Sequence, residues 1–173
     1  MLIFQTQLCD LTLKEGIEEY RSYLKKNNRY LLGENCSEAE KFNILCHDAT
    51  HVIFGLDISI EQEAILDSWV LWGSKWKLSY LLSYQNLPQL KQLYRDLYKE
   101  FGIFGFIKIY WKLGGIKRKV VFRALKMKKK WPFKVPEDYL SKKISHLREI
   151  HGIKVLLPEE MQYAPVTRIE VNS

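Results

Sequence analysis

The chain has 173 residues, enough for one domain with a sizeable core, and its 47% hydrophobic and 27% charged residues are typical of a folded soluble protein. Three cysteines are too few for a disulfide framework and lack the spacing of a thiolate zinc site, so we expect a reducing compartment. The net charge is +7, and no apolar run approaches the roughly 18 residues that a membrane-spanning helix needs.

The N-terminal segment has neither the pattern of a secretory signal nor that of an organelle transit peptide, so we expect the mature chain to begin at Met1. Residues 11–27 place apolar side chains every three or four positions, which is the period of an amphipathic helix. The members of this repeat are Leu13, Ile17, Tyr20 and Leu24. The first helix is therefore predicted here.

Two serine-led motifs predict the starts of the next two helices. The sequence SEAE at 37–40 is typical of a capping box, and its helix is expected to run to about Phe54, where Gly55 allows a left-handed end. The sequence SIEQ at 59–62 is a second capping box, and it opens a long helix predicted to reach residue 84.

The second half of the chain predicts interrupted helices. One helix is expected from Asn86 through Phe101, and the glycines that follow should break the next stretch into one or two shorter helices. These glycines are Gly102, Gly105, Gly114 and Gly115. A further helix is predicted to begin at Pro136 and to end at Gly152. The tail has β-like pieces, and a short hairpin or a surface-wrapping segment are both open.

Together these elements predict an all-α fold. We expect a single-domain helical bundle over residues 1–173, with broken helices and a short irregular or β-like C-terminal tail. Neither an internal repeat nor a linker divides the chain.

Two histidines and two carboxylates fall close together in the second and third predicted helices. His47 and His51 lie about 40° apart on one helix face, and Asp48 lies at about 100°. Asp57 is the midpoint between His51 and Glu63 and also the centre of the predicted loop, so an antiparallel helix pair would hold these two at the same height. The spacing therefore predicts one metal cluster, with the ligands His47, Asp48, His51 and Glu63.

An ordinary interpretation of each residue stays open. A His-x-x-x-His pattern is common by chance, Asp48 could be a solvated carboxylate, and Glu63 could serve only at the start of its helix. The apolar neighbours indicate a buried helix, in which imidazoles and carboxylates are costly unless they satisfy one another or share a cation. These neighbours are Ile44, Leu45, Val52, Ile53 and Phe54.

At these positions the sequence resembles the coenzyme Q (ubiquinone) biosynthesis protein 4 family, which carries H-D-x-x-H, eleven residues and then E. His47, Asp48, His51 and Glu63 match each position at this spacing. The resemblance continues in HVIFGL, from the second histidine onward, and in PEDYLSKKISHLREIHGI, whose Leu-Arg-Glu and Gly-Ile resemble the end of the family's C-terminal helix. It spans roughly residues 34–153.

The resemblance implies an all-helical protein that holds a divalent metal ion with these four residues. Two imidazoles and two carboxylates suit zinc, iron, cobalt or manganese. The resemblance also implies a groove for an isoprenoid or prenylquinone lipid, a membrane surface, and partner enzymes of quinone biosynthesis. The implied reaction is oxidative removal of the ring carboxylate from a polyprenylated hydroxybenzoate. We accordingly expect a homo-oligomer such as a dimer, in the cytoplasm and peripheral on the inner face of a membrane.

Two other functions stay open, and the protein is not assigned as an enzyme by sequence alone. A non-catalytic prenyl-lipid-binding or scaffold protein would carry a structural metal with a closed tetrahedron. A metallohydrolase is the third hypothesis, because HDxxH resembles the HExxH of zinc proteases. Against it, aspartate is a methylene shorter than the glutamate that acts as the base, and Glu63 is unusually close to the motif.

The positive charge is confined to one aromatic segment. Residues 101–136 hold eleven Lys and Arg and no Asp or Glu, whereas the rest of the chain has 16 basic and 20 acidic residues. The aromatic residues among them are Phe101, Phe104, Phe106, Tyr110, Trp111, Phe122, Trp131 and Phe133. Such a segment is typical of contact with an anionic membrane. Core packing with a solvated lysine face stays open, and we expect no nucleic acid partner because no recognised module is present.

We also expect a location or role for four further residues. Cys46 is predicted to be a small core residue. Asp67 follows Glu63 by one helical turn, which places it where it could orient a metal ligand. His146 and His151 do not share a helix face well, and both are expected at the surface.

Overall fold

The structure is a computed structural model that describes residues 2–27, 37–75, 102 and 107–162. Within these ranges the fold is all-α, as predicted, with one short parallel pair of strands, β1 (Ser74–Lys75) and β2 (Trp131–Pro132). The α-helices are α1 (Leu13–Lys26), α2 (Glu38–Phe54), α3 (Ile60–Gly73), α6 (Gly114–Leu125) and α7 (Ile144–His151). The 3₁₀ helices are η1 (Ile3–Gln5), η2 (Glu137–Tyr139) and η3 (Pro158–Glu160). Residues 107–112 are also helical.

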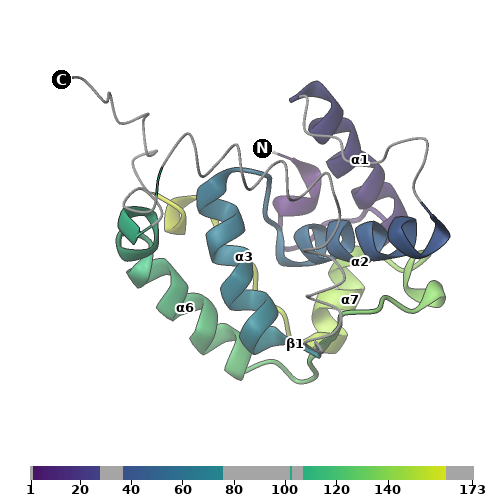
Figure 1. Ribbon diagram of the computed structural model, residues 1–173. Helices are drawn as coiled ribbons and strands as arrows, with labels where there is room; N and C mark the ends of the chain where they lie inside the picture. The colour runs from purple at the N-terminus through teal and green to yellow at the C-terminus, as the bar shows by residue number, and fades with distance from the viewer. Residues whose placement is uncertain (1, 28–36, 76–101, 103–106, 163–173) are drawn as a thin grey trace.

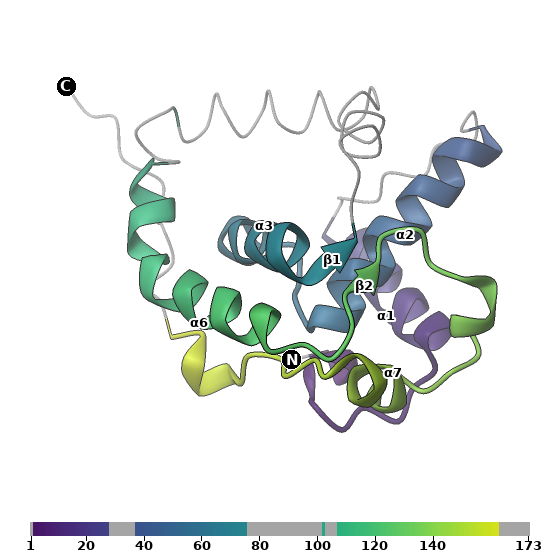
Figure 2. The same ribbon diagram turned by 90° about the horizontal axis from the view of Figure 1, so that it is seen from below.

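The helices pack in the spatial order α1, α2, α3, α6, and α7 packs against α2 (Figures 1 and 2). The core runs between them. Phe54 of α2 and Trp69 of α3 stack with ring centroids 4.7 Å apart, and both side chains are fully buried. Large stacked aromatics of this kind bury much apolar area, so this pair ties the second and third helices together.

The predicted start and end of α2 are confirmed. The Ser37 hydroxyl accepts from the Glu40 amide while the Glu40 carboxylate accepts from the Ser37 amide, and Gly55 ends the helix with φ 71°. The first helix is confirmed too. Its own capping box, made by Thr12 and Glu15, was not recognised from the sequence although the spacing is the same.

The predicted extent of α3 is wrong at its end. The helix stops at Gly73 instead of continuing to residue 84, because Ser74 turns to an extended conformation and β1 pairs with β2. A methyl group on Gly73 would lie 3.2 Å from the Met127 sulfur and 3.3 Å from the Trp69 ring, so this glycine lets the chain after α6 approach. Residues 76–84 lie outside the described residues.

The predicted helix over 136–152 is also wrong, because it is broken into η2 and α7. The backbone between them pairs with the segment at the start of α1: the Leu13 amide donates to the Lys142 carbonyl and the Ile144 amide to the Leu11 carbonyl. The predicted end at Gly152 is confirmed, with φ 68°. Long-range pairing has thus overridden the local helical preference.

The remaining sequence predictions fall partly inside the described ranges. The glycine break is confirmed at Gly114, where α6 begins after a turn at Leu113. In the tail, residues 153–157 have no regular structure, but Ile153, Val155 and Leu156 are buried, so this part wraps the core. The predicted helix from Asn86 to Phe101 and the tail beyond 162 lie outside the described residues.

Candidate metal centre

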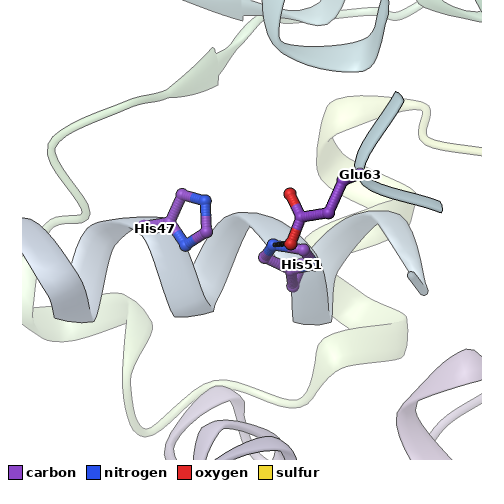
Figure 3. Close-up of side chains that lie close together, drawn as sticks. All are labelled: His47, His51 and Glu63. Atoms are coloured by element: carbon purple, nitrogen blue, oxygen red, sulfur yellow. Dashed lines mark ion pairs between the residues drawn. The ribbon is translucent and has the colours of Figure 1, made fainter. Parts of the chain in front are cut away.

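Three of the four predicted ligands come together where α2 meets α3. His47 and His51 project from the same side of α2, and Glu63 reaches toward them from the first turn of α3 (Figure 3). One ligand atom from each residue lies within 4.8 Å of the other two. His51 Nε2 is 3.3 Å from Glu63 Oε1. This spacing is short enough for a single ion to contact all three side chains.

The loop between the two helices sets this geometry. The Gln62 side chain does not close the predicted capping box with Ser59. Instead it accepts from the Asp57 amide at 2.7 Å and donates to the Asp57 carboxylate at 2.9 Å, while that carboxylate also accepts from the Ser59 amide. These bonds hold the first turn of α3, which carries Glu63.

The two helices are not an antiparallel pair along their length. α3 is steeply inclined to α2 (Figure 1), and the helices meet near the loop that joins them. His51 and Glu63 are nevertheless close, because each lies about one turn from that loop. The predicted proximity therefore holds only for residues near the loop.

His51 is the most constrained member of the site. Its side chain is fully buried, and neither ring nitrogen makes a hydrogen bond of good geometry within the described residues. The Tyr20 ring stacks on it with centroids 4.8 Å apart, and the His47 ring meets it edge-on at 4.7 Å. The Glu63 carboxylate lies 3.3 Å from the His51 Nε2, and a metal ion bound to both would replace this ion pair.

Asp48, the fourth predicted ligand, points to another partner. Its carboxylate accepts from Arg21 Nε of α1 at 2.7 Å and is almost fully buried. The turn of about 100° from His47 carries this side chain toward α1. No sequence pattern links Arg21 to Asp48, because the contact joins positions 27 residues apart. That Asp48 binds the metal stays a prediction.

The electrostatics of the site separate the two histidines. Burial, reinforced by the nearby charge of His51, lowers the pKa of His47 to about 3. Burial acts to lower the pKa of His51 as well, but the Glu63 and Asp48 carboxylates outweigh it and raise that pKa. Burial raises the pKa of Asp48 to about 6 despite Arg21. His47 is therefore neutral and ready to bind a metal, whereas His51 must first release its proton.

The donor set fits a divalent metal. Two imidazoles and one carboxylate are ligands that zinc, iron, cobalt and manganese accept, and three protein ligands are typical of sites that keep a coordination position open. Glu63 is 43% exposed at its side chain, so the site reaches solvent on the side of α3. A small molecule could approach an ion from that side.

A groove of about 560 Å³ lies one helical turn further along α3. Asp67 lines it and accepts a hydrogen bond from the Tyr110 hydroxyl. The Asp67 side chain is thus engaged by the helix at 107–112, and its predicted role in orienting a ligand stays a prediction. The walls of the groove are mainly apolar, with Leu71, Trp72 and Phe122 among them.

The structure shows whether Cys46, His146 and His151 are buried or exposed. Cys46 is buried, as predicted, and His146 is exposed, as predicted. The expectation for His151 is wrong: its side chain is fully buried, with Nδ1 3.0 Å from the Lys129 carbonyl and Nε2 3.2 Å from the Tyr139 hydroxyl. The apolar spacing of α7 puts position 151 on the buried face. The expectation of exposure relied on the residue type, whereas the helical period correctly indicates burial.

Comparisons of the chain with protein-family models, with curated proteins and with solved structures return no match. The class of protein therefore follows from fold and site alone: an all-helical protein with a candidate metal centre of two histidines and a glutamate. Among the described residues, no helix combines the length and the apolar character needed to cross a membrane.

Proposed function

We propose that this protein is a metal-dependent enzyme of prenylated-quinone metabolism, which removes the ring carboxylate of a polyprenylated hydroxybenzoate oxidatively. The observation that carries the proposal is the convergence of His47, His51 and Glu63, whose ligand atoms lie within 4.8 Å of one another. The HDxxH spacing and the glutamate twelve positions later are the features that resemble the coenzyme Q biosynthesis protein 4 family.

The proposed conversion balances with dioxygen as the two-electron oxidant. The bond between the ring carbon and the carboxylate breaks, a bond to oxygen from water forms, and carbon dioxide and hydrogen peroxide leave. A divalent ion bound in this site would supply Lewis-acid or redox chemistry. His47 and His51 would hold the ion as neutral donors and Glu63 as the anionic donor.

The groove beside the site supports an apolar substrate. Its walls are formed by side chains of α3 and α6 together with Tyr110, and Asp67 in its lining follows Glu63 by one turn of the same helix. A ring held near Glu63 could therefore extend its prenyl tail along the groove. Burying such a tail against apolar side chains contributes about 25 cal/mol per Å².

Elemental analysis of the purified protein tests the proposal. We expect close to one zinc, iron, cobalt or manganese ion per chain in the wild type and none in a His47→Ala/His51→Ala double variant. A His146→Ala variant is the matched control, because His146 is exposed on α7 and is not a member of the His47, His51 and Glu63 cluster. If metal is absent from the wild type after reconstitution with each ion, the catalytic function is rejected.

A non-catalytic lipid-binding or scaffold protein with a structural metal is the alternative, and Asp48 discriminates between the two. A closed tetrahedron would require Asp48 to exchange Arg21 for the metal, whereas three ligands leave a position for chemistry. Because Asp48 accepts from Arg21 at 2.7 Å, the geometry favours the open site. An Asp48→Asn variant should then retain its metal, and loss of the metal would favour the structural alternative.

A further inference from the structure

Three polar side chains contact one another in the groove along α3. The Tyr110 hydroxyl donates to the Asp67 carboxylate, and the Lys117 ammonium lies 3.7 Å from the centre of the Tyr110 ring. All three line the groove of about 560 Å³, where α6 packs against α3 (Figure 1). A mainly apolar hollow of this size with a few convergent polar groups is typical of a small-molecule site.

Lys117 is a half-buried cation in the first turn of α6, and its ammonium is held against the Tyr110 ring. Within the described residues this ammonium neither donates a hydrogen bond to an oxygen nor forms an ion pair. The face of a ring stabilises a cation, but it does not accept the three N–H donors of an ammonium as oxygen atoms do. These donors are therefore available to the acceptor oxygens of a ligand in the groove.

The surroundings of Lys117 favour an apolar ligand with one negative charge. Burial lowers the pKa of Lys117, although the charge of Asp67 opposes the shift, so an anion close to the ammonium would offset the cost of its desolvation. Trp72 and Phe122 are among the apolar walls, and they suit a ligand with an apolar body. A single ammonium beside an acidic residue matches the one charge of a carboxylate better than the nearly two charges of a phosphate monoester.

Asp67 is a carboxylate of the groove that would neutralise Lys117 if the two closed to an ion pair. Their charges act on each other, but the Asp67 carboxylate accepts from the Tyr110 hydroxyl instead. Tyr110 thus supports Lys117 in two ways: its ring holds the ammonium, and its hydroxyl holds the carboxylate that competes for the ammonium. Tyr110 and Lys117 both belong to the basic aromatic segment at 101–136, whose Trp131 and Phe133 are buried in the core.

We propose that Lys117 is the specificity-determining residue of the groove: its ammonium binds the carboxylate of an apolar acid, and Tyr110 is the positioning residue that keeps this ammonium available. The apolar body of the ligand then lies along Trp72 and Phe122. One consequence rests on the proposed function. Replacing the ring carboxylate by a hydroxyl removes the group that Lys117 binds, so the groove holds the substrate more tightly than the product.

Isothermal titration calorimetry of the full chain at neutral pH tests the role of Lys117, with 4-octylbenzoate and methyl 4-octylbenzoate as probes. The two probes share a ring and a chain and differ in charge. We expect the wild type to bind the acid about tenfold or more tightly than the ester. Lys117→Gln should bring this ratio close to one by weakening binding of the acid alone, and Lys117→Arg should keep most of the ratio.

Two neighbouring cations provide the controls. Lys108→Gln changes the net charge equally at an exposed position outside the lining of the groove, and it should leave the ratio unchanged. Arg118→Gln removes an exposed cation that also lines the groove, and it should lower the ratio much less than Lys117→Gln does. Equal binding of acid and ester by the wild type would overturn the proposal, as would equal losses in the Lys117 and Arg118 variants.

Tyr110→Phe tests the positioning role, because it keeps the ring beside the ammonium and removes the hydroxyl. The Asp67 carboxylate can then pair with Lys117, so binding of the acid should weaken while binding of the ester stays the same. Adding Asp67→Asn removes the competing charge and should restore binding of the acid. Equal weakening of acid and ester in Tyr110→Phe, or no recovery in the double variant, would reject the positioning role.

The His47→Ala/His51→Ala variant separates this proposal from the proposed function. It should keep the preference for the acid, because neither histidine lines the groove. A third probe, 4-octylphenol, carries a hydroxyl in place of the carboxylate and should bind the wild type as weakly as the ester does. A preference for the acid without stoichiometric metal in the wild type would reject the enzyme and keep the role of Lys117. Stoichiometric metal without that preference would reject the role of Lys117 alone.

Discussion

The His51 ring is fixed by its neighbours more than by hydrogen bonds. Tyr20 stacks on one face with an interplanar angle of 21°, and Phe4 in turn meets Tyr20 edge-on with centroids 6.1 Å apart. A metal ligand needs its ring held at one orientation before the ion arrives, because ordering it on binding costs free energy. Tyr20 is therefore expected to orient a ligand of the candidate site.

A Tyr20→Leu variant should lower metal affinity, whereas Tyr20→Phe should keep it. Stacked aromatic pairs contribute about 0.5–1.5 kcal/mol, so the dissociation constant for zinc is expected to rise about two- to tenfold. Competition titration with a chromophoric chelator measures this change. Leu24→Ala, at a buried position one turn further along α1, should destabilise the fold without changing metal affinity. An unchanged affinity in Tyr20→Leu would contradict the orienting role.

At the scale of elements, α1 packs closely against α2 and α7 at Gly16. A methyl group added to this glycine would lie 2.6 Å from Ile144 Cδ1 and 2.7 Å from Val52 Cγ1. Both neighbours are fully buried, so neither has free space into which to move. Gly16 is thus a packing position, and its helix propensity is secondary.

We expect Gly16→Ala to lower the free energy of unfolding by about 1–2 kcal/mol, because overpacking outweighs the gain in helix propensity. Gly115→Ala is the matched control. No atom lies within 4 Å of a methyl group there, and the position is helical, so the change should be neutral or stabilise by up to about 1 kcal/mol. Urea denaturation measures both variants, and a stabilised Gly16→Ala would show that the interface can relax.

Arg148 joins three elements without a carboxylate hydrogen-bonding partner among the described residues. Its fully buried guanidinium donates to the carbonyls of Val52 and Ile53 at the end of α2, and to those of Phe4 and Thr6 near η1. It thereby satisfies carbonyls that the end of a helix leaves unpaired. These carbonyls directly follow His51, so the same contacts hold the end of α2 that carries the candidate site.

Arg148→Met should therefore be strongly destabilising. It leaves several buried carbonyls unpaired at about 1–3 kcal/mol each, and we expect a loss of at least about 3 kcal/mol in the free energy of unfolding. Arg148→Lys keeps the charge but not the fork of donors, so it should recover only part of this loss. Urea denaturation of both variants tests the role, and a loss below about 1 kcal/mol in Arg148→Met would exclude it.

The sequence predicted what is local and missed what joins distant segments. The caps at Ser37 and Gly55 depend on residues within one turn, and the short spacing from His51 to Glu63 limits their separation whatever the helix angle. The Asp48 partner and the Arg148 contacts depend on positions that only the tertiary fold brings together. Polar side chains at such positions look like surface residues in the sequence. The spacing of the apolar residues along the helix indicates which face is buried, whereas the polar residue type does not.

At the scale of the whole molecule, the candidate metal centre and the groove are neighbours. The metal centre lies where α2 meets α3, and Asp67 in the lining of the groove follows Glu63 by one turn of α3. The hydrogen bonds of Arg148 reach the end of α2, whereas those of His151 join α7 to Tyr139 and Lys129 and involve neither α2 nor α3. His151 is therefore a more suitable probe of fold stability alone than Arg148.

The global stability should depend on pH through His151. Burial lowers its pKa, with the positive charges of Lys129 and Lys75 contributing, although hydrogen bonds to the backbone at Lys129 and Lys130 oppose the shift. The ring is neutral in the folded protein, where Nδ1–H donates to the Lys129 carbonyl and Nε2 accepts from Tyr139. In the unfolded chain it takes up a proton below about pH 6.5.

The stabilisation from this neutral ring is therefore fully present above about pH 6.5 and is lost as the pH falls toward the lowered folded pKa. Other groups titrate in the same range, so the informative quantity is the difference in unfolding free energy between the wild type and His151→Asn, whose amide can still donate to Lys129. This difference should shrink below pH 6.5 by at most about 1.4 kcal/mol per pH unit, the value for one proton. Urea denaturation between pH 5 and 8 measures it. A difference independent of pH would mean that the folded protein accepts the proton at position 151 as readily as the unfolded chain does.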